Sequence, residues 1–204
     1  MVQIPPLLFL IMVKRVFIIH GWDFNPEMHW YPWLKEELES NGFEVIVSEM
    51  PNTSEPDIVE WTEHLGEVVG KIREDDLFIG HSIGGQTIMR YLQDQPENTK
   101  IGGCIIVAGW IKLDNLEDES VEDIARPWLE KPINFEKIKN FTSNWMVFIS
   151  DNDPYNCIEE NQSIFKDRLG AKVSIIEGAG HFTQDDGITE LPEVLDELLS
   201  IAGQ

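Results

Sequence analysis

Short apolar runs rich in β-branched and aromatic residues recur along the chain, each with a turn-forming residue nearby. The first covers residues 16–19 and is followed by His20 and Gly21. Similar runs follow at residues 43–47, 77–79, 104–107, 146–149 and 173–176. Runs of this length and composition are typical of buried β-strands.

Segments with apolar residues at helical spacing lie between these runs. They cover residues 30–38, 58–72, 83–92, 158–169 and 191–201. Apolar strands that alternate with amphipathic helices predict a parallel sheet with helices on both faces. The predicted fold class is therefore α/β, and ligands of such sheets bind beyond the carboxyl ends of the strands.

Residues 110–140 interrupt this alternation with apolar side chains set among many carboxylates. Two interpretations stand side by side: a plain crossover helix with its loops, or a small lid over a site. No internal repeat or Gly/Ser-rich linker divides the chain, so we expect a single domain over residues 12–204.

The amino terminus has an apolar run over residues 7–13 that is far shorter than the ~20 residues needed to span a bilayer. The basic residues Lys14 and Arg15 follow this run, whereas in a signal peptide they precede it. We expect Met12 to be the natural start and residues 1–11 to be an appended extension.

The charge balance adds a constraint on partners. The 204 residues include 15 Lys and Arg against 37 Asp and Glu, which gives a net charge of −22. Such a chain repels phosphate backbones and anionic lipid heads, so we expect no nucleic-acid and no membrane partner. A simpler interpretation is that most carboxylates only solvate helix faces. Cys104 and Cys157 do not form a disulfide framework, and no Cys and His cluster has zinc spacing, so we expect a cytoplasmic protein without a metal.

Residues 80–84 read Gly-His-Ser-Ile-Gly and match the pattern G-x-S-x-G. An expected strand precedes them and an expected helix follows them, which is the context of a nucleophile elbow. The turn exposes the Ser82 hydroxyl above the sheet, beside the free N–H groups of a helix start. A purely structural interpretation is that Ser82 only caps this helix.

A serine nucleophile needs a general base. His181 follows a Gly-Ala-Gly turn beyond the last expected strand and is the best candidate. His29 and His64 fall at or on expected helices, where surface or packing roles are more common. His81 adjoins the nucleophile and should point away from it, and His20 lies in the first turn.

The base needs an acid to orient it, and α/β-hydrolases place this acid between Ser and His in chain order. We predict Asp153, because Pro154 fixes the turn directly after it. Asp151 is the second candidate, and Asp185 and Asp186 are more remote candidates.

An oxyanion hole requires two backbone donors. We expect one to be the N–H of Ile83, directly after the nucleophile. The second should come from the turn after the first strand, with Trp22 preferred and Asp23 next. Ser82 then attacks an acyl carbon and His181 takes its proton, and this chemistry requires no cofactor.

Four segments together resemble a known family. They are residues 17–22 (FIIHGW), 80–85 (GHSIGG), 150–155 (SDNDPY) and 180–182 (GHF), and they are similar to the compact serine hydrolases related to the retinoblastoma-binding hydrolase. The resemblance implies a minimal α/β-hydrolase with six parallel strands in the order 2-1-3-4-5-6, little or no cap domain, and the triad Ser82, Asp153 and His181. No L-x-C-x-E sequence is present, so a retinoblastoma-type partner is not expected.

The leading functional hypothesis is a carboxylesterase that cleaves small neutral esters. Aromatic side chains for an apolar acyl pocket would come from Trp22, Trp110, Trp128 and Phe182, each of which could equally be core. A thioesterase is a close variant, although the acidic surface should repel the phosphates of coenzyme A. An amidase is a further hypothesis, and so is a catalytically weak protein-binding module on the same fold.

Overall fold

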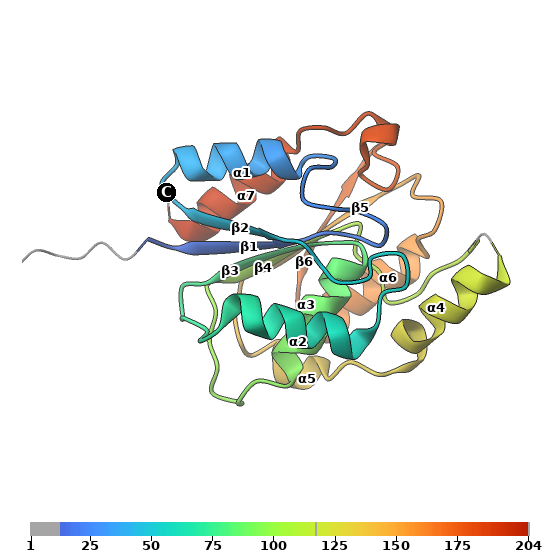
Figure 1. The fold of residues 1–204 in the computed structure, drawn as a ribbon, viewed down its shortest axis with the longest axis horizontal. Helices are drawn as coiled ribbons and strands as arrows, with labels where there is room; N and C mark the ends of the chain where they lie inside the picture. Colours follow the sequence, from blue (N-terminus) through green and yellow to red (C-terminus); the bar gives the residue numbers. More distant parts are fainter. Residues whose placement is uncertain (1–12, 117, 204) are drawn as a thin grey trace, which may run out of the picture.

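The computed structural model describes residues 13–116 and 118–203. A parallel sheet lies at its centre, with the strand order β2-β1-β3-β4-β5-β6 (Figure 1). The strands are β1 (Arg15–Ile19), β2 (Glu44–Ser48), β3 (Leu77–His81), β4 (Gly103–Val107), β5 (Trp145–Ser150) and β6 (Lys172–Ile176). Both the α/β class and the strand order implied by the family resemblance are confirmed.

Helices cover both faces of the sheet. They are α1 (Tyr31–Ser40), α2 (Ile58–Val69), α3 (Ile83–Gln93), α4 (Glu119–Glu130), α5 (Phe135–Ile138), α6 (Ile158–Ile164) and α7 (Pro192–Ala202), with a π-helical turn η1 (Phe165–Leu169) and a 3-10 turn η2 (Gln184–Asp186). Helices α1 and α7 pack on one face, and α2, α3, α5 and α6 pack on the other (Figure 1). None of the helices in the described ranges has the length and apolar character needed to cross a bilayer.

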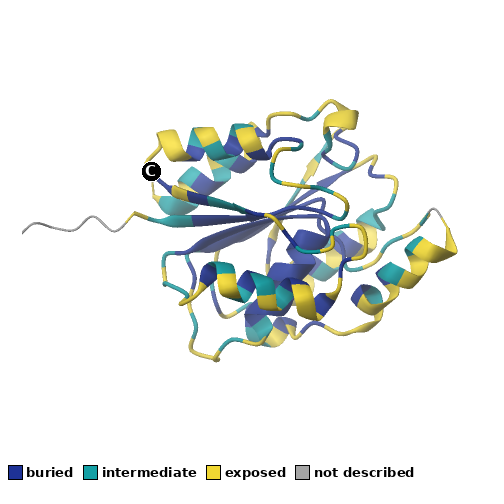
Figure 2. Cartoon of the chain, in the orientation of Figure 1, coloured by how far each residue is buried: buried dark blue, intermediate teal, exposed yellow. Residues whose placement is uncertain are grey.

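Side-chain alternation along the strands divides the core into two layers. In β1, Phe17 and Ile19 face the layer under α2 and α3, whereas Val16 and Ile18 face the layer under α1 and α7. Every residue of β3, β4 and β5 is buried, so these central strands read as continuous apolar runs in the sequence (Figure 2). This burial fixes the carboxyl ends of the strands, on which the site is built.

The helices differ in places from their expected bounds. The helix expected over 58–72 ends at Val69, because Gly70 leaves helical geometry with φ of 60°. The helix expected over 158–169 is α-helical to Ile164 and continues as the π-helical turn η1. The expectation that residues 1–11 are an extension concerns residues outside the described ranges.

Residues 110–140 contain the two helices α4 and α5. Helix α5 packs against α3 and η1, whereas α4 lies beyond the carboxyl ends of the strands (Figure 1). Asp118 caps α4 by accepting hydrogen bonds from the N–H groups of Ser120 and Val121. Trp128 near the other end of α4 is buried and donates from Nε1 to the carbonyl of Pro56 at 2.9 Å. The helix is therefore anchored to the core near its carboxyl end.

Candidate active site

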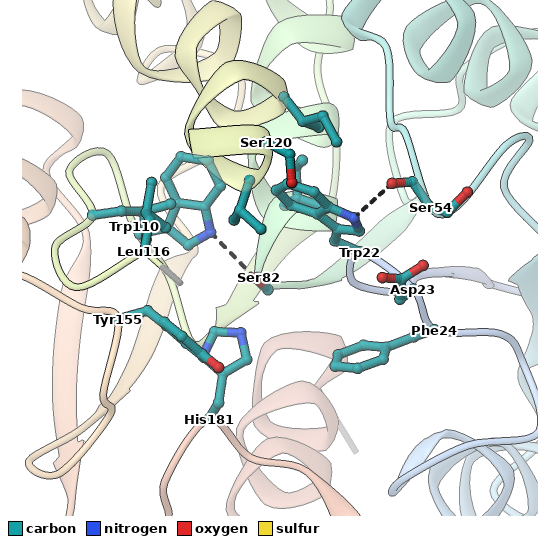
Figure 3. A pocket seen from close by; sticks show the side chains of 14 residues that line it. Trp22, Asp23, Phe24, Ser54, Ser82, Trp110, Leu116, Ser120, Tyr155 and His181 are labelled. Atoms are coloured by element: carbon teal, nitrogen blue, oxygen red, sulfur yellow. Dashed lines mark hydrogen bonds between the residues drawn. The ribbon is translucent and has the colours of Figure 1, made fainter. Parts of the chain in front are cut away.

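Ser82 lies in the sharp turn between β3 and α3. Its backbone has φ of 53° and ψ of −120°, a strained conformation for a residue with a side chain. The Ser82 side chain makes no capping hydrogen bond to α3. The interpretation that Ser82 only caps the helix is therefore wrong, and the hydroxyl points instead into a cavity (Figure 3).

The glycines of the elbow are required by close backbone contacts. A Cβ atom on Gly84 would lie 2.2 Å from the carbonyl oxygen of Ile19, and one on Gly80 would lie 2.5 Å from the nitrogen of Gly85. Backbone atoms cannot move aside as a flexible side chain would. A larger residue at position 84 would push α3 away from β1, and one at position 80 would push α3 away from β3; either would shift Ser82.

His181 and Asp153 come together beyond the ends of β5 and β6. Nδ1 of His181 lies 2.9 Å from Oδ2 of Asp153, whose side chain is fully buried. Oδ1 of Asp153 accepts a hydrogen bond from the N–H of Tyr155 at 3.1 Å. A carboxylate can only accept, so Nδ1 of His181 carries a proton, and in the neutral imidazole Nε2 keeps a free lone pair. That tautomer is the one a general base needs.

Within the described residues, no hydrogen bond joins Asp151, Asp185 or Asp186 to the imidazole of His181. Asp151 accepts a hydrogen bond from the N–H of Gly178 at 2.7 Å. Asp186 accepts from the N–H groups of His181 (2.9 Å) and Thr183 (3.1 Å). Asp151 and Asp186 therefore shape the loop that carries the histidine, while Asp153 orients the ring.

Ser82 and His181 line the same cavity (Figure 3). Oγ of Ser82 accepts a hydrogen bond from Nε1 of Trp110 at 3.2 Å. Within residues 13–116 and 118–203, no hydrogen bond joins Ser82 to the His181 ring. Catalytic hydrogen bonds are commonly long in unliganded enzymes and tighten when substrate binds.

The expected oxyanion donors lie next to Ser82. Ile83 is the first residue of α3, and an N–H group in the first turn of a helix has no partner within the helix. Trp22 lies in the turn after β1 and also lines the cavity. The N–H of Asp23 is already donated to the carbonyl of Thr53 at 2.9 Å. Trp22 and Asp23 were the two residues expected to supply the second backbone N–H. The N–H of Asp23 is therefore already engaged in another hydrogen bond.

The cavity has a volume of about 450 Å³. Apolar side chains dominate its lining: Trp22, Phe24, Ile83, Trp110, Leu113, Leu116, Val121 and Ile124. Three of them, Leu116, Val121 and Ile124, come from α4 or the segment just before it. Of the four aromatic residues expected in an acyl pocket, Trp22 and Trp110 line it, whereas Trp128 and Phe182 are buried in the two core layers because their rings complete the packing there.

The chain matches a known family over most of its length. A profile of the family described as serine hydrolase matches residues 16–200. The chain belongs to the serine hydrolase family.

Among its relatives is YdeN of Bacillus subtilis (strain 168), a hydrolase by name, to which the chain is 28% identical over 190 residues. The match covers 93% of this chain and 96% of YdeN. The crystal structure of the ydeN gene product superimposes with a TM-score of 0.85 at 26% identity, covering 94% of this chain and 100% of that one. A carboxylesterase structure from Nitrososphaera gargenis shares the fold, with a TM-score of 0.69 at 14% identity, covering 94% of this chain and 92% of that one. The narrower resemblance to the retinoblastoma-binding hydrolase stays a prediction.

The buried contacts of His81, the residue directly before Ser82, were not anticipated from the sequence. His81 is completely buried, and burial lowers its pKa well below the ordinary value. Its ring contacts Tyr31 through Nδ1 (2.6 Å) and the backbone carbonyl of His181 through Nε2 (2.8 Å). The prediction that His81 points away from Ser82 agrees with these contacts. Its link to the loop that carries His181 needed the fold, because His81 and His181 lie 100 positions apart.

Asn161 is a second structural residue that the sequence did not reveal. It is fully buried in α6, and its Oδ1 accepts from the N–H groups of Ile111 and Lys112, both at 2.8 Å. Its Nδ2 donates to the Lys112 carbonyl at 2.7 Å. Asn161 thereby fixes the chain immediately after Trp110, at the wall of the cavity.

No group of three or more His, Cys, Asp or Glu side chains within residues 13–116 and 118–203 is arranged to hold a metal ion. Burial raises the pKa of the Cys104 thiol far above its ordinary value, and Cys157 also has a raised pKa because it is partly desolvated. Both thiols therefore stay protonated and are poor nucleophiles.

Proposed function

We propose that the chain is a carboxylesterase that cleaves small uncharged esters by an acyl-enzyme mechanism. Ser82 is the nucleophile, His181 the general base and Asp153 the residue that orients the base. The observation that carries the proposal is the His181–Asp153 pair of 2.9 Å, which faces the same cavity as a serine held at φ of 53°. Strain of this kind in a buried turn is retained where it serves a function.

The acylation step transfers one proton and forms one covalent bond. Oγ of Ser82 attacks the carbonyl carbon of the ester while its proton moves to Nε2 of His181. The carbonyl π electrons move to oxygen, and the N–H groups of Ile83 and Trp22 stabilise the resulting oxyanion. His181 then gives its proton to the alcohol oxygen as the C–O bond breaks, which leaves an acyl group on Ser82.

Deacylation repeats these steps with water. His181 removes a proton from water as the water oxygen attacks the acyl carbon, and it returns the proton to Oγ as the carboxylic acid leaves. Asp153 stabilises the imidazolium formed in both halves of the cycle. The residues around Ser82 supply every proton transfer, so the proposed reaction needs no cofactor.

The lining of the cavity supports an uncharged substrate. Most of the cavity wall is apolar, and Asp23, the only carboxylate that residues 13–116 and 118–203 contribute to the lining, is exposed. The net charge of −22 adds a long-range repulsion for anions. A coenzyme A thioester carries several phosphates and is therefore a poor substrate on this proposal.

We further propose that residues 110–140 form a lid on a single hydrolase domain over residues 12–204. The support for a lid is the position of α4, because Ser120, Val121 and Ile124 all line the cavity. The opposite side of α4 is exposed and acidic, including Glu122 and Asp123 (Figure 2). A plain crossover helix would pack against the sheet, as α3 does.

A series of p-nitrophenyl esters tests the proposed activity. We expect hydrolysis of the acetate and butyrate by the wild-type protein and a loss of about 10⁴-fold or more in Ser82→Ala. The matched control is Ser143→Ala, in an exposed turn near the other end of the sheet. Hydrolysis that survives in Ser82→Ala, or a folded wild-type protein inactive on every ester, would reject the proposal.

A further inference from the structure

The indole of Trp110 touches the reacting atom of the proposed nucleophile. Its Nε1 lies 3.2 Å from Oγ of Ser82 (Figure 3). The two residues are buried, with 3% of Trp110 and 8% of Ser82 exposed. An indole N–H can only donate, so Oγ of Ser82 is the acceptor in this contact.

Trp110 is tied to the same helix as the nucleophile. Its backbone carbonyl accepts a hydrogen bond at 3.1 Å from Nε2 of Gln86, a buried residue on α3. A second link lies just before Trp110 in the chain. The carbonyl of Val107, at the end of β4, accepts a hydrogen bond from the N–H of Ser82 at 2.8 Å. Ala108 then turns the chain with φ of 50°. Both sides of the Trp110–Ser82 contact therefore belong to one rigid unit made by β3, β4 and α3.

We propose that Trp110 is a further catalytic residue, which holds Oγ of Ser82 through its indole N–H; this role rests on the esterase mechanism proposed above. A serine hydroxyl has one proton and two lone pairs. When one lone pair accepts from Trp110, the hydroxyl proton must point elsewhere, and the His181 ring lines the same cavity (Figure 3). The contact thereby orients the proton toward the base.

The same N–H stabilises charge on Oγ as the reaction proceeds. Hydrogen bonds to an ionised acceptor are roughly twice as strong as those to a neutral one. As the proton moves from Oγ to Nε2 of His181, Oγ gains negative charge and the contact with Trp110 strengthens. The same contact strengthens again in deacylation, because Oγ leaves the acyl carbon and carries negative charge until His181 returns the proton. Trp110 keeps its own proton throughout.

The position beside Oγ of Ser82 suits a group that can donate a hydrogen bond but cannot accept one. A tyrosine or serine hydroxyl at the same place could take the Ser82 proton into its own hydrogen bond and compete with His181. The indole N–H has no lone pair for such a contact. The role is therefore distinct from lining an acyl pocket, which any large apolar side chain could do.

The experiment separates the hydrogen bond from the bulk of the ring. Two variants are compared with wild type: Trp110→Phe, and a protein with β-(3-benzothienyl)alanine at position 110, in which sulfur replaces the indole N–H with little change of shape. The readouts are the rate constant for phosphonylation of Ser82 by diisopropyl fluorophosphate across pH, and kcat and KM for p-nitrophenyl acetate. Trp145→Phe is the matched control, because it removes a buried indole at the opposite end of β5.

Both position-110 variants should react roughly 10-fold to 100-fold more slowly than wild type, less than the loss of a full oxyanion-hole donor. We expect kcat to fall with KM nearly unchanged, and Trp145→Phe to react at the wild-type rate. A benzothienyl variant that reacts within about twofold of wild type would overturn the role of Trp110 while leaving the esterase proposal intact. An unreactive, folded wild-type protein would instead reject the esterase mechanism, and the role of Trp110 with it.

Discussion

His81 donates a hydrogen bond from Nε2 to the backbone carbonyl of His181 across 2.8 Å. A carbonyl only accepts, so Nε2 of His81 carries the proton, and Nδ1 of the neutral ring accepts from the hydroxyl of Tyr31 at 2.6 Å. His81, the residue directly before the proposed nucleophile, thus holds the loop of the proposed base. The pKa of His81 lies well below its ordinary value because of burial, which keeps the ring neutral.

Tyr31→Phe tests this connection. The substitution leaves Nδ1 of His81 buried without a donor, which should lower the free energy of unfolding by roughly 1–3 kcal/mol. Urea unfolding measures this loss. We also expect kcat for p-nitrophenyl acetate to fall while KM is unchanged, because the loop of His181 loosens. Tyr91→Phe is the matched control, since within residues 13–116 and 118–203 the Tyr91 hydroxyl makes no hydrogen bond; an equal effect in both variants would contradict the connection.

The two carboxylates after β5 should behave differently when neutralised. Asp153→Asn should lower turnover on the order of 10⁴-fold, because an amide in contact with Nδ1 favours the wrong tautomer of His181. Asp151→Asn removes only the negative charge, because the amide oxygen can still accept a hydrogen bond from the N–H of Gly178, and it should cost far less. Steady-state kinetics of the two variants at pH 7 compare them directly. A greater loss in Asp151→Asn would reassign the acid.

Three buried histidines make stability depend on pH. Burial lowers the pKa of His20, His29 and His81, that of His29 to about 4. Below about pH 6.5 the unfolded chain binds protons that the folded chain does not, so stability falls as pH decreases. Each such histidine contributes up to about 1.4 kcal/mol per pH unit, until the pH reaches its folded-state pKa.

Urea unfolding of wild type and His29→Gln between pH 7 and pH 4.5 measures this effect. The glutamine can still accept the hydrogen bond that Nδ1 of His29 accepts from the N–H of Gln184. Carboxylate repulsion is common to both proteins and cancels in the comparison. The wild-type protein should lose more stability on acidification than the variant does. Identical pH slopes would mean that His29 already titrates normally in the folded protein.

Helix α4 should set the acyl-chain preference. Ile124→Trp narrows the cavity and should reduce turnover of long p-nitrophenyl esters while sparing the acetate, whereas Ile124→Ala should favour longer chains. Glu122→Gln on the exposed side of the same helix is the control. A chain-length profile that is unchanged in both Ile124 variants would show that α4 is a crossover helix without a role as a lid.

The sequence predicted the sheet because its central strands are buried on both faces. Residues 77–79, 104–107 and 146–149 are continuously apolar, and each lies within an observed strand. The elbow was equally visible, because its residues form one short motif, in which Gly80 is required by a close contact with the backbone of Gly85 only five positions later. Local rules of this kind act over a few residues and leave a clear pattern.

The contacts around the site were less visible because they join distant segments. The partners Trp110 and Ser82 lie 28 positions apart, as do His181 and Asp153. Turn chemistry favoured Asp153 over Asp151, but only the fold brings the Asp153 carboxylate to the imidazole. Trp128 and Phe182 were indistinguishable from pocket residues in sequence, since aromatic rings serve cores and cavities alike.

Covalent labelling of Ser82 tests the central proposal most directly. The folded wild-type protein is treated with a fluorophosphonate, and the modified residue is located by mass spectrometry of its peptides. We expect a single phosphonyl group on Ser82, formed in wild type and absent from Ser82→Ala. A folded wild-type protein that stays unlabelled, or a label that persists in Ser82→Ala, would contradict the proposed mechanism.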